Sequence, residues 1–150
     1  MTKTPDFTWS DGWLLCSVGL AAERGPATLQ DVIAAGDSVN HAIFTNAELR
    51  RGFAKLIAAG HVKHEGDRFD VSEEVRVLIA AQNKRIRMDT LRARVDSFLG
   101  AAPYPAGHPG YEDPDWPFPQ LTDSAINAAI RGYHKWFRQE YARLRKKQRK

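Results

Sequence analysis

The sequence predicts a mainly helical fold with one small β-hairpin and a C-terminal helical extension. An amphipathic segment over 45–59 ends at a glycine and is followed by two short segments of alternating residues, 61–64 and 68–71. Apolar residues recur at helical spacing through most of the remaining chain. We expect residues 1–80 to form one domain and residues 81–150 to form an extension.

The composition is that of an ordinary folded protein. The chain has 150 residues, 43% of them hydrophobic and 10% aromatic, which is enough for a packed core. Its one cysteine, Cys16, cannot form an intramolecular disulfide, as is usual in a reducing compartment. The N-terminus has no apolar signal region, and no apolar run has the length of about 18 residues that a membrane span requires. We therefore expect a cytoplasmic protein that does not enter the membrane.

Positive charge is concentrated late in the chain. Residues 1–49 hold two basic and six acidic residues, whereas residues 121–150 hold nine basic and two acidic residues. Clustered basic residues are what a polyanion-binding surface needs. Terminal basic runs are also common on solvated helices, so both interpretations remain open for the tail.

Helix-capping patterns divide the first 60 residues into three helices. Thr8, Thr28 and Thr45 are each followed three residues later by an acidic residue, as in a capping box. The first helix is predicted over about 9–23, and the second begins near residue 29 and ends near Gly36. Residues 37–43 are expected to form either a packed connector or an irregular helical turn.

The third helix and the hairpin after it have clear inward faces. Leu49, Phe53, Leu56 and Ile57 share one side of the helix at about 100° per residue. The opposite side carries Ala47, Arg51, Lys55 and Ala58. The hairpin residues predicted to lie in the core are Val62, Phe69 and Val71.

Three motifs follow one another in this part of the chain: the capped segment beginning at Phe44-Thr45, then Ala59-Gly60-His61-Val62, then Phe69-Asp70-Val71-Ser72. On these motifs, residues 9–80 resemble a winged helix-turn-helix domain of the kind found in bacterial transcriptional regulators. The resemblance implies a DNA-binding regulator whose helix 45–59 enters the major groove of double-stranded DNA while the wing, residues 61–71, contacts phosphates. The DNA-binding residues it implies are Asn46, Arg50, Arg51, Lys55, Lys63, His64 and Arg68.

A second function remains open. Glu48 near the helix start and Asp67 at the hairpin tip would repel phosphate, and basic residues also occur on any solvated helix face. The alternative is a winged-helix protein–protein interaction module that does not bind DNA.

The second half of the chain predicts a dimerising extension. Segment 73–99 changes its apolar face part-way, so it is either two helices or one helix with two partners. Residues 100–120 hold six of the eight prolines and are expected to run as an extended strap across the protein or a partner subunit. A long last helix follows, with its apolar stripe expected to dock on the first helix or on the second half of 73–99. We expect a homodimer through 73–99 and 121–145. The apolar positions of that stripe are Ile126, Ile130, Tyr133, Phe137, Tyr141 and Leu144.

The sequence offers no catalytic signature. It has no glycine-rich phosphate loop, no nucleophile elbow and no paired-cysteine metal site. His61 and His64 could supply two metal ligands, but no acidic or cysteine partner stands out nearby, so ordinary hairpin histidines are favoured. We expect no enzymatic activity, no cofactor and no bound metal.

Overall fold

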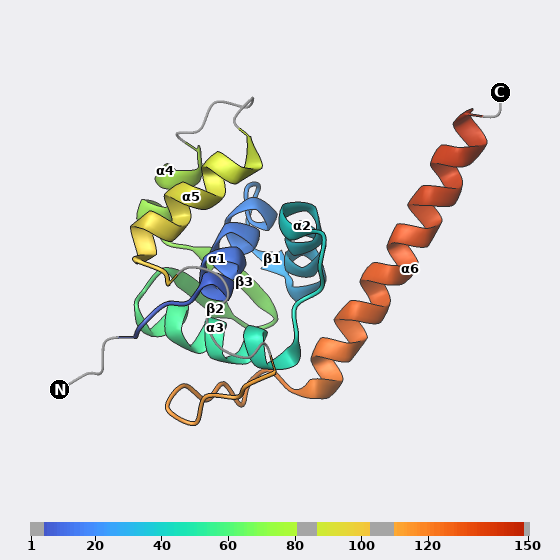
Figure 1. Ribbon diagram of the computed structural model, residues 1–150. Helices are drawn as coiled ribbons and strands as arrows, with labels where there is room; N and C mark the ends of the chain where they lie inside the picture. Colours follow the sequence, from blue (N-terminus) through green and yellow to red (C-terminus); the bar gives the residue numbers. More distant parts are fainter. Residues whose placement is uncertain (1–4, 81–86, 103–109, 149–150) are drawn as a thin grey trace.

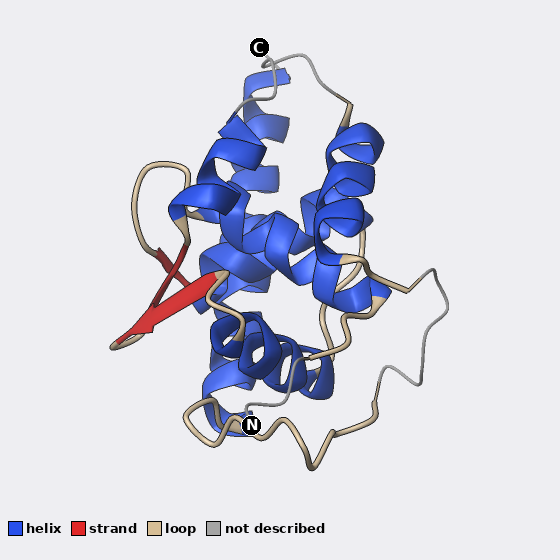
Figure 2. Ribbon diagram, turned by 90° about the vertical axis from the view of Figure 1, so that its left-hand side faces the viewer, coloured by secondary structure: helices blue, strands red, loops and turns tan. Residues whose placement is uncertain are grey.

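The computed structural model describes residues 5–80, 87–102 and 110–148. It is mainly helical, with a small antiparallel sheet (Figures 1 and 2). In chain order the elements are α1 (Trp9–Ala21), β1 (Ala27–Thr28), α2 (Leu29–Asn40), α3 (Asn46–Ala58), β2 (Val62–Glu65), β3 (Arg68–Val71), α4 (Glu73–Ala80), α5 (Met88–Leu99) and α6 (Asp123–Gln148).

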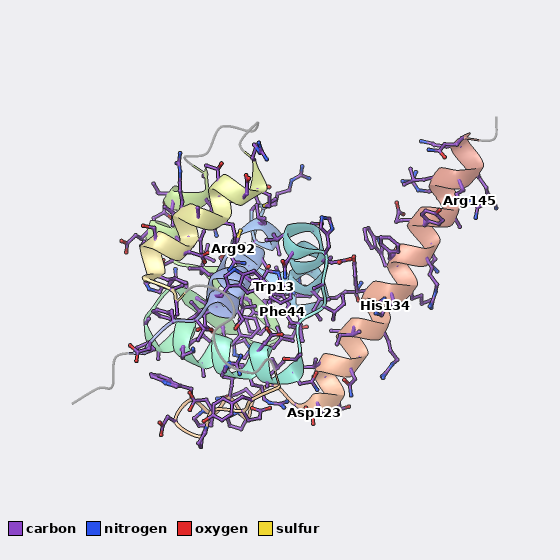
Figure 3. All side chains as sticks on the ribbon, in the orientation of Figure 1. Trp13, Phe44, Arg92, Asp123, His134 and Arg145 are labelled. Atoms are coloured by element: carbon purple, nitrogen blue, oxygen red, sulfur yellow. The ribbon has the colours of Figure 1, made fainter. Side chains whose placement is uncertain are left out.

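Helix α1 is the centre of the fold. It is buried along most of its length and contacts α2, α3, α4, α5 and β3. Trp13 stacks on Phe44 with ring centroids 3.7 Å apart, and its indole N–H donates to the carbonyl oxygen of Gly36 over 2.9 Å. Figure 3 shows Trp13 and Phe44 in the middle of the helical body. The tryptophan is therefore a satisfied core residue.

All three predicted capping boxes form. In each, the threonine backbone N–H donates to the acidic side chain three residues on, as in the 2.9 Å bond from Thr45 to Glu48. The second helix is longer than predicted, because it continues through Gly36 and ends at His41, which adopts a left-handed backbone with φ of 54°. The connector before α3 is correspondingly shorter.

The hairpin formed by β2 and β3 is antiparallel. Val62 pairs with Val71, and His64 pairs with Phe69. Val62, Phe69 and Val71 are buried in the core, which confirms that prediction. The two-residue strand β1 was not predicted; it pairs with β3 and completes a sheet of order β1-β3-β2.

The described residues of segment 73–99 form two separate helices, α4 and α5. Arg87, directly before α5, has an extended backbone with ψ of 145°, so a single continuous helix is excluded. Helix α5 packs on α1 and buries Leu91, Val95 and Leu99 in the same core as the first three helices. Residues 81–86 lie outside the described residues.

Helix α6 docks differently from the prediction. Its first half packs on α2 rather than on α1 or α5, and there it buries Ile126 and Tyr133. Its second half extends away from the body, as the red end of the ribbon shows (Figure 1). Among the described helices, none is both long and apolar enough to cross a membrane.

Candidate functional site

The polar face of α3 is covered by other parts of the chain. All thirteen residues of α3 are described, and among them only Ala58 is exposed. Residues 110–121 lie across one side of the helix, with Phe118 buried against Phe53 at a ring distance of 6.1 Å. In the described residues this face is therefore covered rather than open to solvent.

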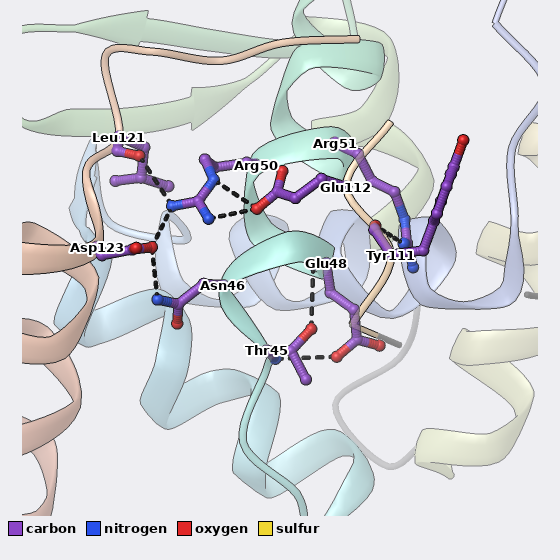
Figure 4. Close-up of polar contacts among 9 residues, drawn as sticks. All are labelled: Thr45, Asn46, Glu48, Arg50, Arg51, Tyr111, Glu112, Leu121 and Asp123. Carbon is purple, nitrogen blue, oxygen red and sulfur yellow. Dashed lines mark hydrogen bonds and ion pairs between the residues drawn. The ribbon is translucent and has the colours of Figure 1, made fainter. Parts of the chain in front are cut away.

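Arg50 is held by two carboxylates from the covering segment and α6 (Figure 4). Its guanidinium forms ion pairs with Glu112 and with Asp123, the latter at 2.6 Å. The hydrogen bond to Glu112 is the main cause that raises the pKa of Arg50 above its usual value. Asn46 joins the same cluster by donating its amide N–H to Asp123 over 2.8 Å. The hydrogen-bond donors of Arg50 and Asn46 are thus used within the chain, by Glu112 and Asp123.

Arg51 and Lys55 are buried, with 5% and 3% of their surfaces exposed. Arg51 donates to the backbone carbonyl of Tyr111. Lys55 forms an ion pair with Asp11 of α1 and also donates to the carbonyl of Asp6 over 3.1 Å. A buried cation needs such partners because unpaired charge is costly away from water. These two residues hold α3 to its surroundings.

The predicted residues of the hairpin are more accessible. Lys63 and Arg68 are exposed and line a shallow hollow of about 370 Å³ together with Glu65 and Asp70. Arg68 also lies 3.6 Å from Asp67. His64 stacks on Phe69 at 4.6 Å and meets Phe118 edge-on at 5.4 Å, so its ring is a packing element. Cations and carboxylates alternate here, which weakens the local attraction for phosphate.

The seven predicted DNA-binding residues therefore fall into two groups. The four on α3 form hydrogen bonds or ion pairs with other residues of the chain. Of the three on the hairpin, two are exposed cations and the third, His64, packs on aromatic rings. The carboxylates that neutralise Arg50 were not predicted as part of the site. Glu112 and Asp123 lie 62 and 73 residues from Arg50 in the sequence, so no helical or strand spacing links them.

No family profile, curated protein or solved structure matches this chain.

The second half of α6 carries the other distinctive surface. Four large apolar side chains there are exposed over about half of their surface, which is unusual for residues of their size. Against α2 they form a groove of about 460 Å³, lined on the α2 side by small residues. From the sequence, Phe137, Tyr141 and Leu144 are expected to be buried by docking. The sequence pattern does not include Trp136 in this surface. The exposed members are Trp136, Phe137, Tyr141 and Leu144.

Contacts within α6 and to α2 order this stripe. Phe137 and Tyr141 stack with their rings inclined by only 9°, and the Arg145 guanidinium lies 5.8 Å from the Tyr141 ring. At the base of the stripe the Tyr133 hydroxyl donates to Asp37 of α2 over 2.5 Å. Burial and this bond raise the pKa of Tyr133 to about 12. The bond fixes α6 to α2 at the point where the exposed half begins.

Cys16 and His61 are packed against other side chains of the described core. Burial raises the pKa of the Cys16 thiol to about 11, which keeps it protonated and unreactive at neutral pH. Burial lowers the pKa of His61, whose ring lies edge-on to Phe98 at 4.9 Å. Within the described residues, no group of three or more histidine, cysteine or acidic side chains could hold a metal ion.

Proposed function

We propose that this chain is a winged-helix protein–protein interaction module whose binding surface is the exposed half of α6. The order of helices and strands, with a hairpin after the third helix and a sheet of order β1-β3-β2, supports the winged-helix assignment. One observation favours this function most. The helix that would enter a DNA groove is covered, whereas a helix outside the compact body exposes four large apolar side chains.

The internal pairing of the α3 cations supports the proposal energetically. A helix can enter the major groove only if its side chains reach base edges and phosphates. To contact DNA, Arg51 and Lys55 would have to leave their buried positions. Arg51 would then lose its hydrogen bond to the carbonyl of Tyr111, and Lys55 would lose its ion pair with Asp11. Breaking a buried ion pair by removing one partner costs about 3–5 kcal/mol. DNA contacts by α3 would have to offset that cost.

The exposed stripe supports a protein partner in particular. Aromatic residues are enriched at the centres of protein interfaces, where they supply most of the binding energy. A basic helix with aromatic residues can also lie on a membrane surface. The stripe, however, continues directly from the buried contact between α6 and α2, where Ile126 and Tyr133 already pack on a protein surface.

DNA binding is the second candidate, favoured by the exposed cations of the last turns of α6. Arg143, Arg145, Lys146 and Lys147 are all exposed, and Glu140 is the one carboxylate among residues 136–148 of that helix. With Lys63 and Arg68 of the hairpin, they could contact phosphates without any change at α3. This form of binding would be largely independent of base sequence.

Binding to random-sequence duplex DNA, followed by fluorescence anisotropy between about 50 and 200 mM salt, distinguishes these functions. The proposal predicts that Arg50→Gln with Arg51→Gln leaves both the affinity and its salt dependence unchanged. If α3 reads DNA, this variant weakens binding, and the log–log salt slope falls by about one for each phosphate that the variant no longer neutralises. That outcome would overturn the proposal.

A matched variant tests the second candidate. Lys146→Gln with Lys147→Gln removes two cations from a fully exposed helix end, so its folding should be unaffected. If the tail binds phosphate, this variant lowers the salt slope while the α3 variant does not. Absence of salt-dependent binding by the unmodified protein would exclude the second candidate.

A further inference from the structure

We propose that a second copy of this chain covers the exposed stripe, with the two α6 helices packed antiparallel. The proposal rests on the interaction function above and names its partner. In this dimer the two-fold axis passes near Glu140, so that Leu144 of one copy faces Phe137 of the other. The partner helix lies over the groove between α2 and α6.

The shape of the groove fits a helix. Small side chains form its α2 wall and large ones form its α6 wall, so a second helix can approach the α2 backbone closely. Leu144 and the three exposed aromatic residues are the projecting side chains available to enter such a groove. Each copy therefore offers both the groove and the side chains that fill it, as a two-fold interface requires. The small residues of the α2 wall are Ala34, Ala35 and Ser38.

The apolar stripe of α6 continues without a break from its intramolecular half. Ile126, Ile130 and Tyr133 pack on α2, and Phe137, Tyr141 and Leu144 extend the same line at spacings of three and four residues. A second copy would prolong a helix–helix contact that the monomer already makes. One helix face would then be buried along its whole length.

The charges of α6 decide the relative direction of the two helices. The basic side chains of α6 gather near its C-terminal end, at Arg143, Arg145, Lys146 and Lys147. A parallel pair would bring the two basic C-terminal ends together, where they would repel each other. An antiparallel pair about an axis near Glu140 separates these ends, because each then lies beside residues near Tyr133 of the partner. The opposed helix dipoles favour the same direction.

The exposed stripe supplies a large part of the area that a dimer of ordinary size buries. A large aromatic side chain buries about 150–250 Å² when fully covered. The three half-exposed aromatic residues and Leu144 together supply about 350 Å² per copy, somewhat less than half of the about 800 Å² that each partner buries in a stable interface. The α2 wall and the polar rim along α6 would supply the remainder. Stacking of Phe137 on Tyr141 lowers the entropy cost of association.

Sedimentation equilibrium of the full chain tests this proposal. We expect a mass of twice 16.9 kDa at micromolar concentration. Phe137→Glu with Tyr141→Glu should raise the dimer dissociation constant at least about 100-fold, as loss of two central anchors does. Leu144→Lys, near the exposed end of the helix, should weaken the dimer without touching the core. The matched control is Ala142→Glu, which adds a carboxylate to the opposite face of the same helix and should remain a dimer.

Cross-linking between two labelled populations tests the direction. One population carries Phe137→Cys and the other Leu144→Cys, both with Cys16→Ser to remove the native thiol. The antiparallel dimer predicts disulfides that join the two populations, whereas a parallel dimer predicts disulfides within each population. Parallel linkage, or a monomeric mass for the unmodified protein, would overturn the proposal. The two proposals can fail separately. If the protein is a monomer and the Arg50→Gln, Arg51→Gln variant leaves DNA binding unchanged, the dimer is excluded, and the interaction function then requires a different partner.

Discussion

Lys55 of α3 forms an ion pair with Asp11 of α1, and the two side chains are only 4% and 0% exposed. Asp11 also accepts the backbone N–H of Thr8 and thereby begins α1, so one carboxylate joins the start of one helix to the last turn of another. Lys55 is thus a structural residue. Lys55, which the sequence predicts as a DNA contact, instead fixes α3 against α1.

Loss of this ion pair should be costly. Lys55→Met leaves the Asp11 carboxylate buried without its counter-charge and should lower the free energy of unfolding by about 3–5 kcal/mol. Adding Asp11→Asn should recover part of that loss, because the buried charge is then removed. Urea denaturation of the single and double variants measures both effects. Lys63→Met on the exposed hairpin is the control and should change stability by less than about 0.5 kcal/mol.

The bonds at the start of α6 predict a pH dependence. Hydrogen bonds from Asn46 and then Arg50 lower the pKa of Asp123 below its ordinary value of 3.8. The folded protein therefore releases this proton more readily than the unfolded chain. The resulting stabilisation is fully present above the ordinary pKa and is lost as the pH falls through the lowered one.

Carbonyl-detected NMR titration measures the pKa of Asp123 directly. Asn46→Ala should raise it toward 3.8, because the largest cause of the shift is removed. Asn40→Ala at the end of α2 serves as a control and should leave it unchanged. A pKa of Asp123 at or above 3.8 in the unmodified protein would contradict the contact between α3 and α6.

Tyr133 predicts a second dependence, at high pH. Its pKa is raised from 10.0 to about 12 by burial and by the hydrogen bond to Asp37. The folded protein holds this proton more tightly than the unfolded chain, so the stabilisation is full below pH 10 and declines as the pH rises toward 12.

Absorbance titration of the tyrosines should show one phase near pH 12 that Tyr133→Phe abolishes. The same substitution should lower the free energy of unfolding by about 1 kcal/mol, the usual contribution of one hydrogen bond. Tyr141→Phe, at an exposed position, should change neither the high-pH phase nor the stability. Persistence of that phase in the Tyr133 variant would assign it to another residue.

Two helix glycines should respond oppositely to alanine. A Cβ at Gly36 would lie 2.4 Å from the Phe44 ring, which is itself stacked on Trp13 and cannot withdraw. Gly36→Ala should therefore cost about 1–3 kcal/mol. A Cβ at Gly132 would meet the flexible end of Gln30, which can turn away. Gly132→Ala should be neutral or stabilise by up to about 1 kcal/mol, and thermal unfolding compares the two.

The local features of the fold could be predicted because they depend on nearby residues. The capping boxes at Thr8, Thr28 and Thr45 and the alternation of the hairpin all involve neighbours within a few positions. Gly36 misled the prediction of the second helix end, since glycine often stops a helix. Here it lies inside α2 because only a residue without a side chain fits beneath Phe44.

The state of the α3 surface could not be predicted in the same way. Whether Arg50 faces solvent depends on its ion pairs with Glu112 and Asp123. These two carboxylates lie near Arg50 only because residues 110–121 run across α3. The docking of α6 on α2 likewise depends on which of several apolar faces remains available once α1 has been enclosed. An apolar stripe predicts that a helix will be buried but does not name its partner.

The outward face of α3 is closed in the described residues, and we infer that the surface that binds a partner lies on α6. Rates of thiol labelling test this closure most directly, with Ala47→Cys and Ala58→Cys compared in the Cys16→Ser background. Both positions lie on the side of α3 away from Leu49 and Phe53, but Ala47 is 5% exposed whereas Ala58 is exposed. We predict that the thiol at position 47 is labelled at least about tenfold more slowly, in line with the free energy needed to open a packed segment. Equal rates in two variants of unchanged stability would show that the face is open and would contradict the account.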